Sequence, residues 1–153
     1  MANWQSEGVT VLSVLPAAIT APTDTSTNDL WTVTVPGGAM GLYGFIEVNV
    51  VFSCVNNANS KTAKINFGGS LAANISMANA LSASAEKRIF NIGSESVQRS
   101  AGVTLIRNNG NSGTAGLVGT VDTSADFDIV VNLLKGTGAD SVILEAASVV
   151  LFK

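Results

Sequence analysis

Residues 45–54, FIEVNVVFSC, alternate between apolar and polar side chains. Successive side chains of a β-strand project to opposite faces of the sheet, so residues two positions apart share a face. The apolar set is Ile46, Val48, Val50 and Phe52, and the polar set is Glu47, Asn49 and Ser53. This pattern predicts a strand that buries one face and exposes the other.

The same period of two continues along the chain on both sides of this strand. It places Trp31, Val33, Val35, Ala63, Ile65 and Phe67 on inward positions of residues 30–35 and 61–67. Further strands are expected in residues 70–77, 86–93, 102–108, 116–123, 126–134 and 141–152. Polar turns separate these strands, and the Ala- and Ser-rich residues 71–87 lack a helical stripe, so at most one helical turn is expected there. Short strands with frequent turns predict an all-β sandwich or barrel.

Composition limits the classes of partner. The 153 residues fit one domain, apolar residues reach 46%, charged residues only 12%, and the mean hydropathy is +0.38. The net charge is −3 and no basic block is present. We therefore expect neither a nucleic-acid nor a membrane partner. The one adjacent basic pair, Lys87 and Arg88, is predicted to be a solvated strand edge.

The sequence holds no histidine, which excludes the usual catalytic triads and imidazole acid–base pairs. Lysine or carboxylate chemistry stays possible in principle. Asp122, Asp126 and Asp128 form the best acidic cluster, but their spacing misses the calcium-loop pattern, and a solvated surface is the expected role. The glycines do not form a phosphate-binding motif. The sequence therefore predicts no metal, no cofactor and no enzymatic activity.

The single cysteine and the aromatic residues favour packing over chemistry. Cys54 shares the inward parity of its strand, so we expect a small buried hydrophobe. A sugar-binding platform needs exposed aromatic rings, and Trp31 falls on an inward position. Trp4 and Tyr43 remain, and core or interface packing is the expected use of both.

The first 28 residues differ from the rest. They carry two of the three prolines and a polar run, TDTSTN, that favours a loop. No basic leader precedes the short apolar run, so neither a signal peptide nor a membrane span is expected, and synthesis in a host cytoplasm is inferred. We predict an extended N-terminal arm over residues 1–28 and a sandwich over residues 29–153.

The C-terminal strand is apolar on both parities. Strict alternation groups Val142, Leu144, Ala146, Val150 and Phe152 on one face, and Ile143, Ala147, Val149 and Leu151 on the other. Strands buried on both faces read as nearly continuous apolar runs. A second layer must therefore cover this strand, supplied either by copies of the chain or by its own arm, and the sequence leaves open which face is the core.

Residues 64–77, 89–108 and 122–152 together resemble the small jelly-roll modules of tailed-bacteriophage virion proteins. The shared features are an Asn- and Gly-rich loop, an Asp-rich entry to a long strand, and the acid-Ser-Val-x-Leu-Glu pattern from Asp140 to Glu145. Such modules occur in capsid decoration proteins and in tail or fibre proteins, usually as trimers. The resemblance implies an antiparallel jelly-roll β-sandwich and carries over no catalytic residue.

Together these observations predict a non-catalytic decoration or cement protein on a capsid surface. We expect the chain to assemble with itself as a homotrimer and to bind the major capsid protein or another virion protein. The alternative is a receptor- or glycan-binding module of a phage tail or fibre. The expected self-association residues are Val142, Ile143, Leu144, Val149, Val150, Leu151 and Phe152. The expected capsid-binding arm residues are Trp4, Val9, Val11, Leu12, Val14, Leu15 and Ile19.

Overall fold

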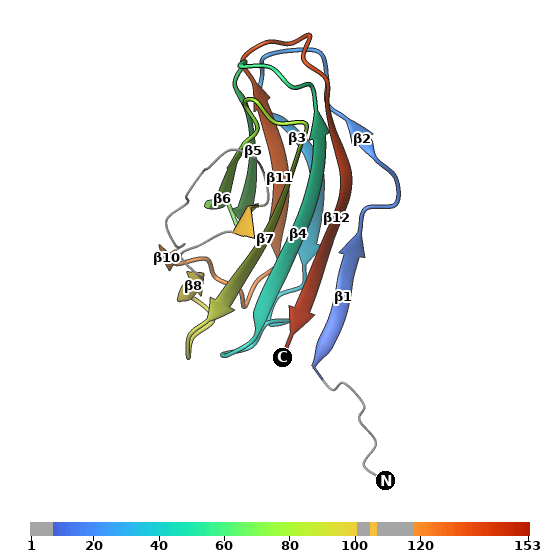
Figure 1. Cartoon of the computed structure of the whole chain (residues 1–153). Coiled ribbons are helices and arrows are strands. Elements are labelled where there is room, and N and C mark those ends of the chain that lie inside the picture. Colours follow the sequence, from blue (N-terminus) through green and yellow to red (C-terminus); the bar gives the residue numbers. More distant parts are fainter. Residues whose placement is uncertain (1–7, 101–104, 107–117) are drawn as a thin grey trace.

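The computed structural model describes residues 8–100, 105–106 and 118–153, and these residues form β-strands and connections with no helix (Figure 1). The strands are β1 Val9–Val14, β2 Ile19–Thr20, β3 Asn28–Val35, β4 Phe45–Cys54, β5 Lys61–Phe67, β6 Ser70–Ser76, β7 Ser82–Asn91, β8 Gln98–Ser100, β9 Leu105–Ile106, β10 Val118–Gly119, β11 Phe127–Lys135 and β12 Val142–Phe152. The all-β prediction is confirmed, and the Ala- and Ser-rich segment 71–87 forms β6, a turn and β7.

Two antiparallel sheets stack as a sandwich. The larger sheet has the order β1-β12-β4-β7-β8-β10, with β2 also paired to β12 and β9 to β7. The smaller sheet has the order β3-β11-β5-β6. Counting β1, β3, β4, β5, β6, β7, β11 and β12 as strands one to eight, the sheets read 1-8-3-6 and 2-7-4-5. Except for the hairpin of β5 and β6, consecutive strands of these eight thus lie in opposite sheets in the manner of a jelly roll, which confirms the predicted fold class.

The hydrophobic core lies between the two sheets. Ile46, Val48, Val50 and Phe52 of β4 are almost completely buried, as their alternation predicted, and Cys54 is buried on the same parity. The smaller sheet contributes inward side chains such as Ala63, Ile65 and Phe67, and the Phe67 ring packs on Phe127 with centroids 4.6 Å apart. Burying each large apolar side chain contributes about 1.5–3 kcal/mol. The two-residue period therefore positions most of the core.

The predicted N-terminal arm supplies two strands to the larger sheet. β1 runs beside the C-terminal half of β12 and β2 beside its start (Figure 1). Backbone hydrogen bonds from Leu15 N to Ala147 O (2.8 Å) and from Ala21 N to Val142 O (2.9 Å) continue the pairing. The side chains of Leu15 and Ala21 are buried. In this chain the jelly roll therefore begins within the segment assigned to the arm.

A β-bulge in β12 changes which side chains point inward. Leu144 pairs with Phe52 and Ala146 pairs with Val51, so Glu145 is one extra residue on the β12 side. After the bulge, inward positions fall on odd numbers, and the buried set is Val142, Leu144, Ala147, Val149 and Leu151. Strict alternation was therefore wrong for the second half of the strand. The outward set after the bulge is Ala146, Ser148, Val150 and Phe152.

Candidate functional site

The outer face of the larger sheet carries several exposed apolar side chains, among them Val11, Val14 and Val51. It is built by the outward side chains of β1, β12, β4 and β7, which lie opposite one another in the antiparallel register. We call this surface the large-sheet face. Its apolar members are Val9, Val11, Val14, Phe45, Val51, Phe90, Ile143, Ala146, Val150 and Phe152.

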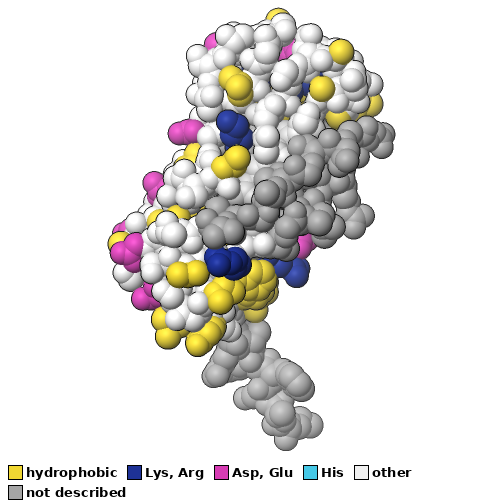
Figure 2. Space-filling model, turned by 90° about the vertical axis from the view of Figure 1, so that its left-hand side faces the viewer, with side chains coloured by type: hydrophobic (Ala, Val, Ile, Leu, Met, Phe, Trp, Pro, Cys, Tyr) yellow, Lys and Arg dark blue, Asp and Glu magenta, His cyan; other side chains and the backbone are white. Residues whose placement is uncertain are grey.

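A row of aromatic rings crosses one end of the large-sheet face. Phe152 pairs with Phe45 in the register, and Phe45 pairs with Phe90. The first two rings stack with centroids 4.3 Å apart, and the second two with centroids 4.7 Å apart. Val9 extends the row on β1 because it lies opposite Phe152. The row lies where β4 begins and β7 and β12 end, and hydrophobic side chains gather toward this lower end in Figure 2.

A short charged row lies next to the aromatic row, with one arginine paired to two carboxylates of the same chain. The Arg88 Nε donates to Glu47 Oε2 at 2.7 Å, and its Nη2 lies 3.0 Å from Glu86 Oε1. Partial burial raises the pKa of Glu47, but hydrogen bonds from Asn49 and Arg88 outweigh that effect and hold the pKa below its ordinary value. These charges therefore already have partners before any other molecule approaches.

A shallow hollow lies between β12 and β4 in the middle of the large-sheet face. It has a volume of about 180 Å³ and is lined by Val14, Asn49, Val51, Ala146, Ala147 and Ser148. The lining is almost entirely apolar, and it contains no carboxylate, lysine or arginine. This arrangement suits the packing of an apolar side chain rather than acid–base chemistry.

The outer face of the smaller sheet is polar by contrast. One row crosses all four strands through Asp29, Asn132, Lys64 and Asn74. Next to the end of this face, the Thr34 hydroxyl donates to Asp128 at 2.7 Å. Apolar residues on this face include Leu71 and Leu134, which lie among threonine, serine and asparagine side chains. Water therefore suits this face as a neighbour.

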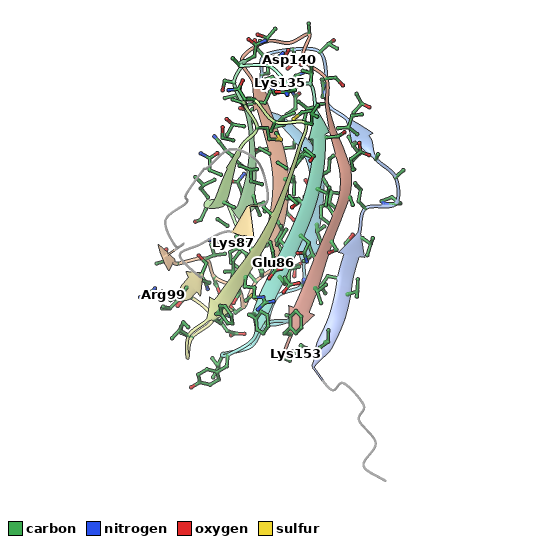
Figure 3. The ribbon with its side chains drawn as sticks, in the orientation of Figure 1. Glu86, Lys87, Arg99, Lys135, Asp140 and Lys153 are labelled. Atoms are coloured by element: carbon green, nitrogen blue, oxygen red, sulfur yellow. The ribbon has the colours of Figure 1, made fainter. Side chains whose placement is uncertain are left out.

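One end of the sandwich is closed by buried charged groups. The Lys61 ammonium donates to Asn57 Oδ1 at 2.6 Å and lies 3.8 Å from Asp140 Oδ2. Asn57 in turn donates to Asp140 Oδ1 at 2.9 Å, and Lys135 donates to the Asp140 carbonyl at 2.9 Å. Figure 3 shows Asp140 and Lys135 together at the upper end, away from Glu86. This cluster fastens the β4–β5 loop to the β11–β12 loop.

Buried amides fasten the opposite end. Asn91 donates to the Gly41 carbonyl at 2.6 Å and to the Thr123 hydroxyl at 2.8 Å. Gln98 donates to Asn91 Oδ1 at 2.9 Å and accepts a bond from the Val121 amide at 2.9 Å. Neither end cluster combines a nucleophile with a histidine or with a pair of facing carboxylates. Both arrangements hold loops in place.

The predicted self-association residues divide between core and surface. Val142, Leu144, Val149 and Leu151 belong to the buried core of this chain. Ile143, Val150 and Phe152 point outward onto the large-sheet face, where they are partly exposed.

The predicted arm residues divide in the same way. Leu15 is buried, and Leu12 and Ile19 pack against the core. Val9, Val11 and Val14 are exposed, and Trp4 lies outside the described residues. The bulge at Leu12, between the pairs of Val11 and Ser13, explains why Leu12 turns inward while Val14 stays outward.

Lys87 differs from its predicted environment, and of the two uses predicted for Tyr43 only interface packing is still open. Lys87 is 1% exposed on the inward parity of β7 between Ala85 and Ile89, so the solvated edge predicted for it is wrong, and burial lowers its pKa. Arg88, its neighbour, does face solvent. Tyr43 is 77% exposed, so within this chain it is not a core residue.

The acidic residues and the cysteine show how little chemistry the described residues assemble. Asp122 accepts bonds from Ser124, and Asp126 accepts one from the Gly37 amide at 2.8 Å, both on the surface. Burial raises the pKa of Cys54, which disfavours the reactive thiolate. In the described part of the chain, no three His, Cys, Asp or Glu side chains cluster in a way that could hold a metal ion. No helix of that part is long and apolar enough to span a membrane.

Comparison with known proteins gives similar structures at low sequence identity. No protein-family model matches the chain, and no curated protein matches its sequence. The structure of infectious bursal disease virus, Gt strain, matches at 10% identity and a TM-score of 0.43, with 94% of this chain and 32% of the viral chain covered. The VP2 subviral particle of the same virus matches at 10% identity and a TM-score of 0.36, covering 94% and 31%. This chain therefore spans about a third of those viral chains.

A third similar structure is that of polysaccharide lyase family 18 aly-SJ02 r-CATD. It matches at 8% identity and a TM-score of 0.41, with 95% of each chain covered.

Proposed function

We propose that this protein is a non-catalytic structural component of a virion, a capsid decoration or cement protein that assembles as a homotrimer and binds the major capsid shell. The observation that carries the proposal is the large-sheet face, which is apolar and uncovered within the described residues. Contiguous apolar surfaces of this kind mark interaction sites on soluble proteins. The resemblance of residues 64–77, 89–108 and 122–152 to phage jelly-roll modules supports a virion location and three-fold assembly.

The proposed self-contact uses the outward side chains of β12. Ile143, Val150 and Phe152 are the members of the predicted set that the fold leaves accessible. Phe152 lies in the aromatic row, and Val150 lies between that row and the central hollow. The four inward members stabilise the sandwich itself, so substitutions there report on folding rather than on assembly.

The proposed shell contact lies in the N-terminal segment before β1. Leu12, Leu15 and Ile19 are occupied by this chain's own core, so they are poor candidates for gripping another protein. Trp4 is the aromatic residue of the segment, and aromatic residues are enriched among the strongest contacts at protein interfaces. Three such segments on one trimer would bind at high effective concentration, so weak individual contacts could still hold a shell.

A cryo-electron microscopy map of a virion that contains this chain tests the proposal. We expect three-fold density on the outer surface of the shell, and we expect a Trp4→Ala variant to keep its oligomeric mass while losing shell binding. A variant that lacks residues 2–7 is the matched truncation, because it leaves every described strand intact. Density at a tail tip would contradict the decoration role and support the tail or fibre alternative.

A further inference from the structure

We propose that Val9, Val11 and Val14 of β1 belong to the self-association surface, and that the partner which covers them is a second copy of this chain. The inference rests on the self-association proposed above and adds a part of the chain that was predicted to grip the shell instead. It also assigns the aromatic row and the central hollow to the same contact.

The strand register places these valines beside the outward residues of β12. Val9 lies opposite Phe152, and Val11 lies opposite Val150. Opposed residues of an antiparallel pair project to the same side of the sheet and lie about 4.5–5.5 Å apart at Cβ. The valines therefore extend the outward face of β12 without a gap.

The bulge in β1 keeps this extension apolar along the whole strand. With unbroken alternation, an outward Val11 would put Val14 on the inward parity. The extra residue, Leu12, takes the inward position, so Val14 faces outward opposite Ser148. The exposed fractions are 48% for Val9, 60% for Val11 and 59% for Val14. Three exposed β-branched residues on one strand face are therefore available for contact.

The area of the large-sheet face matches what a stable contact between copies needs. With six residues in β1 and ten or eleven in each of β12, β4 and β7, strands spaced about 4.8 Å apart and rising about 3.3 Å per residue span roughly 600 Å² before side-chain relief. A standard protein interface buries about 800 Å² per partner, and the range begins near 600 Å². Without β1 the face would lose about a quarter of its width. The β1 valines therefore bring the face into the size range of a stable interface.

The charges on this face limit which of its parts a second copy can cover. Arg88 is paired with Glu47 and Glu86, and Ser53 donates a hydrogen bond to Glu145. One arginine offsets only one of these two carboxylates, and Glu145 has a hydroxyl rather than a cation as its partner, so the contact between copies must leave these carboxylates at its solvated rim. The β1 sequence VTVLSV carries no charge and so selects an apolar partner. A second copy offers the same apolar rows, and in a three-fold ring different parts of the face can meet.

The test compares Val11→Asp with Leu71→Asp by size-exclusion chromatography with light scattering. Leu71 is a matched control because it is 45% exposed on the polar outer face of the smaller sheet. We expect V11D to reduce the mass to that of one chain while L71D keeps the native mass, with native circular dichroism for both. If V11D does not fold, the Val11→Thr, Val14→Thr double variant keeps β-branched residues and should dissociate at higher concentrations than the native protein.

The outcomes separate this inference from the function on which it rests. If Val150→Asp dissociates while a folded V11D keeps the native mass, the β1 assignment is wrong and the self-association stands. If V11D keeps the native mass but no longer binds capsid shells, the valines contact the shell and the inference is also wrong. A native protein that is monomeric overturns both proposals.

Discussion

The two outer faces of the sandwich obey the same folding rule and yet differ in what they expose. Each sheet buries one face against the other sheet, which requires alternation but leaves the outward residues free to vary. Both outer faces carry charged side chains. The smaller sheet otherwise exposes mainly asparagine and threonine, whereas the larger sheet adds valines and a stacked phenylalanine row. Folding does not require this difference. It is the reason that we propose the large-sheet face as the self-association surface.

The largest expected effect on stability comes from placing a charge at an inward position of β12, compared with the same substitution at an outward position. Leu144→Asp places an unpaired carboxylate at a fully buried position and should cost more than about 4 kcal/mol, enough to prevent folding. Val150→Asp, on the outward side, should fold and lose self-association. Circular dichroism melting followed by light scattering distinguishes the two. A folded, assembled L144D would mean that the bulge at Glu145 has been assigned to the wrong position.

The next largest effect on stability is expected at the buried cluster of Lys61, Asn57 and Asp140 at one end of the sandwich. Lys61→Met removes the cation from a buried group of carbonyl and carboxylate acceptors and should lower the unfolding free energy by about 3 kcal/mol. Lys64→Met is the control on the polar face, where we expect a change within about 0.5 kcal/mol. Urea unfolding measures both variants. Equal losses would show that the Lys61 cluster does not fasten the loops as described.

A smaller effect should appear in acid. The hydrogen bond from Asn57, with help from Asn59, Lys61 and Lys135, holds the pKa of Asp140 below its ordinary value despite burial. The stabilisation is complete above the unfolded-state pKa of about 3.9 and is lost as the pH falls through the lower folded-state pKa. As the pH is lowered stepwise, the unfolding free energy should therefore fall more steeply for the native protein than for Asp140→Asn. Parallel curves would contradict this role for Asp140.

The smallest effect is expected on the polar face. Leu134→Asp changes an exposed apolar residue of β11 to a charged one among polar neighbours. We expect the unfolding free energy to change by no more than about 0.5 kcal/mol, with no change in oligomeric mass. Dissociation of this variant would mean that the smaller sheet, rather than the larger one, carries the self-contact.

Periodicity was enough to predict the sandwich and most of its core. The inward residues of β4 and β5 follow strict alternation, so their buried positions could be read directly. The bulges at Leu12 and Glu145 could not, because one extra residue reverses parity without a distinctive sequence signal here. Those two bulges decide which valines face outward. These two bulges are therefore the reason that the sequence did not predict which residues of β1 and β12 form the candidate site.

The buried charges were missed for a different reason. Lys61 is buried because Asn57 and Asp140 provide acceptors, and Asp140 lies far away in the sequence. Local pattern alone suggests exposure for any lysine, since lysine is rarely buried without partners. Strict alternation in β7 places Lys87 on the inward side, but its charge led to the prediction of a solvated edge. Contacts between distant segments decide such positions.

The molar mass of the native protein in solution tests the central claim most directly, because an uncovered large-sheet face is the basis of the whole functional proposal. Light scattering at micromolar concentration should give three times the chain mass of 15.6 kDa. A mass of one chain at every concentration tested would contradict the account, since the apolar face would then stay exposed to water without a copy to cover it.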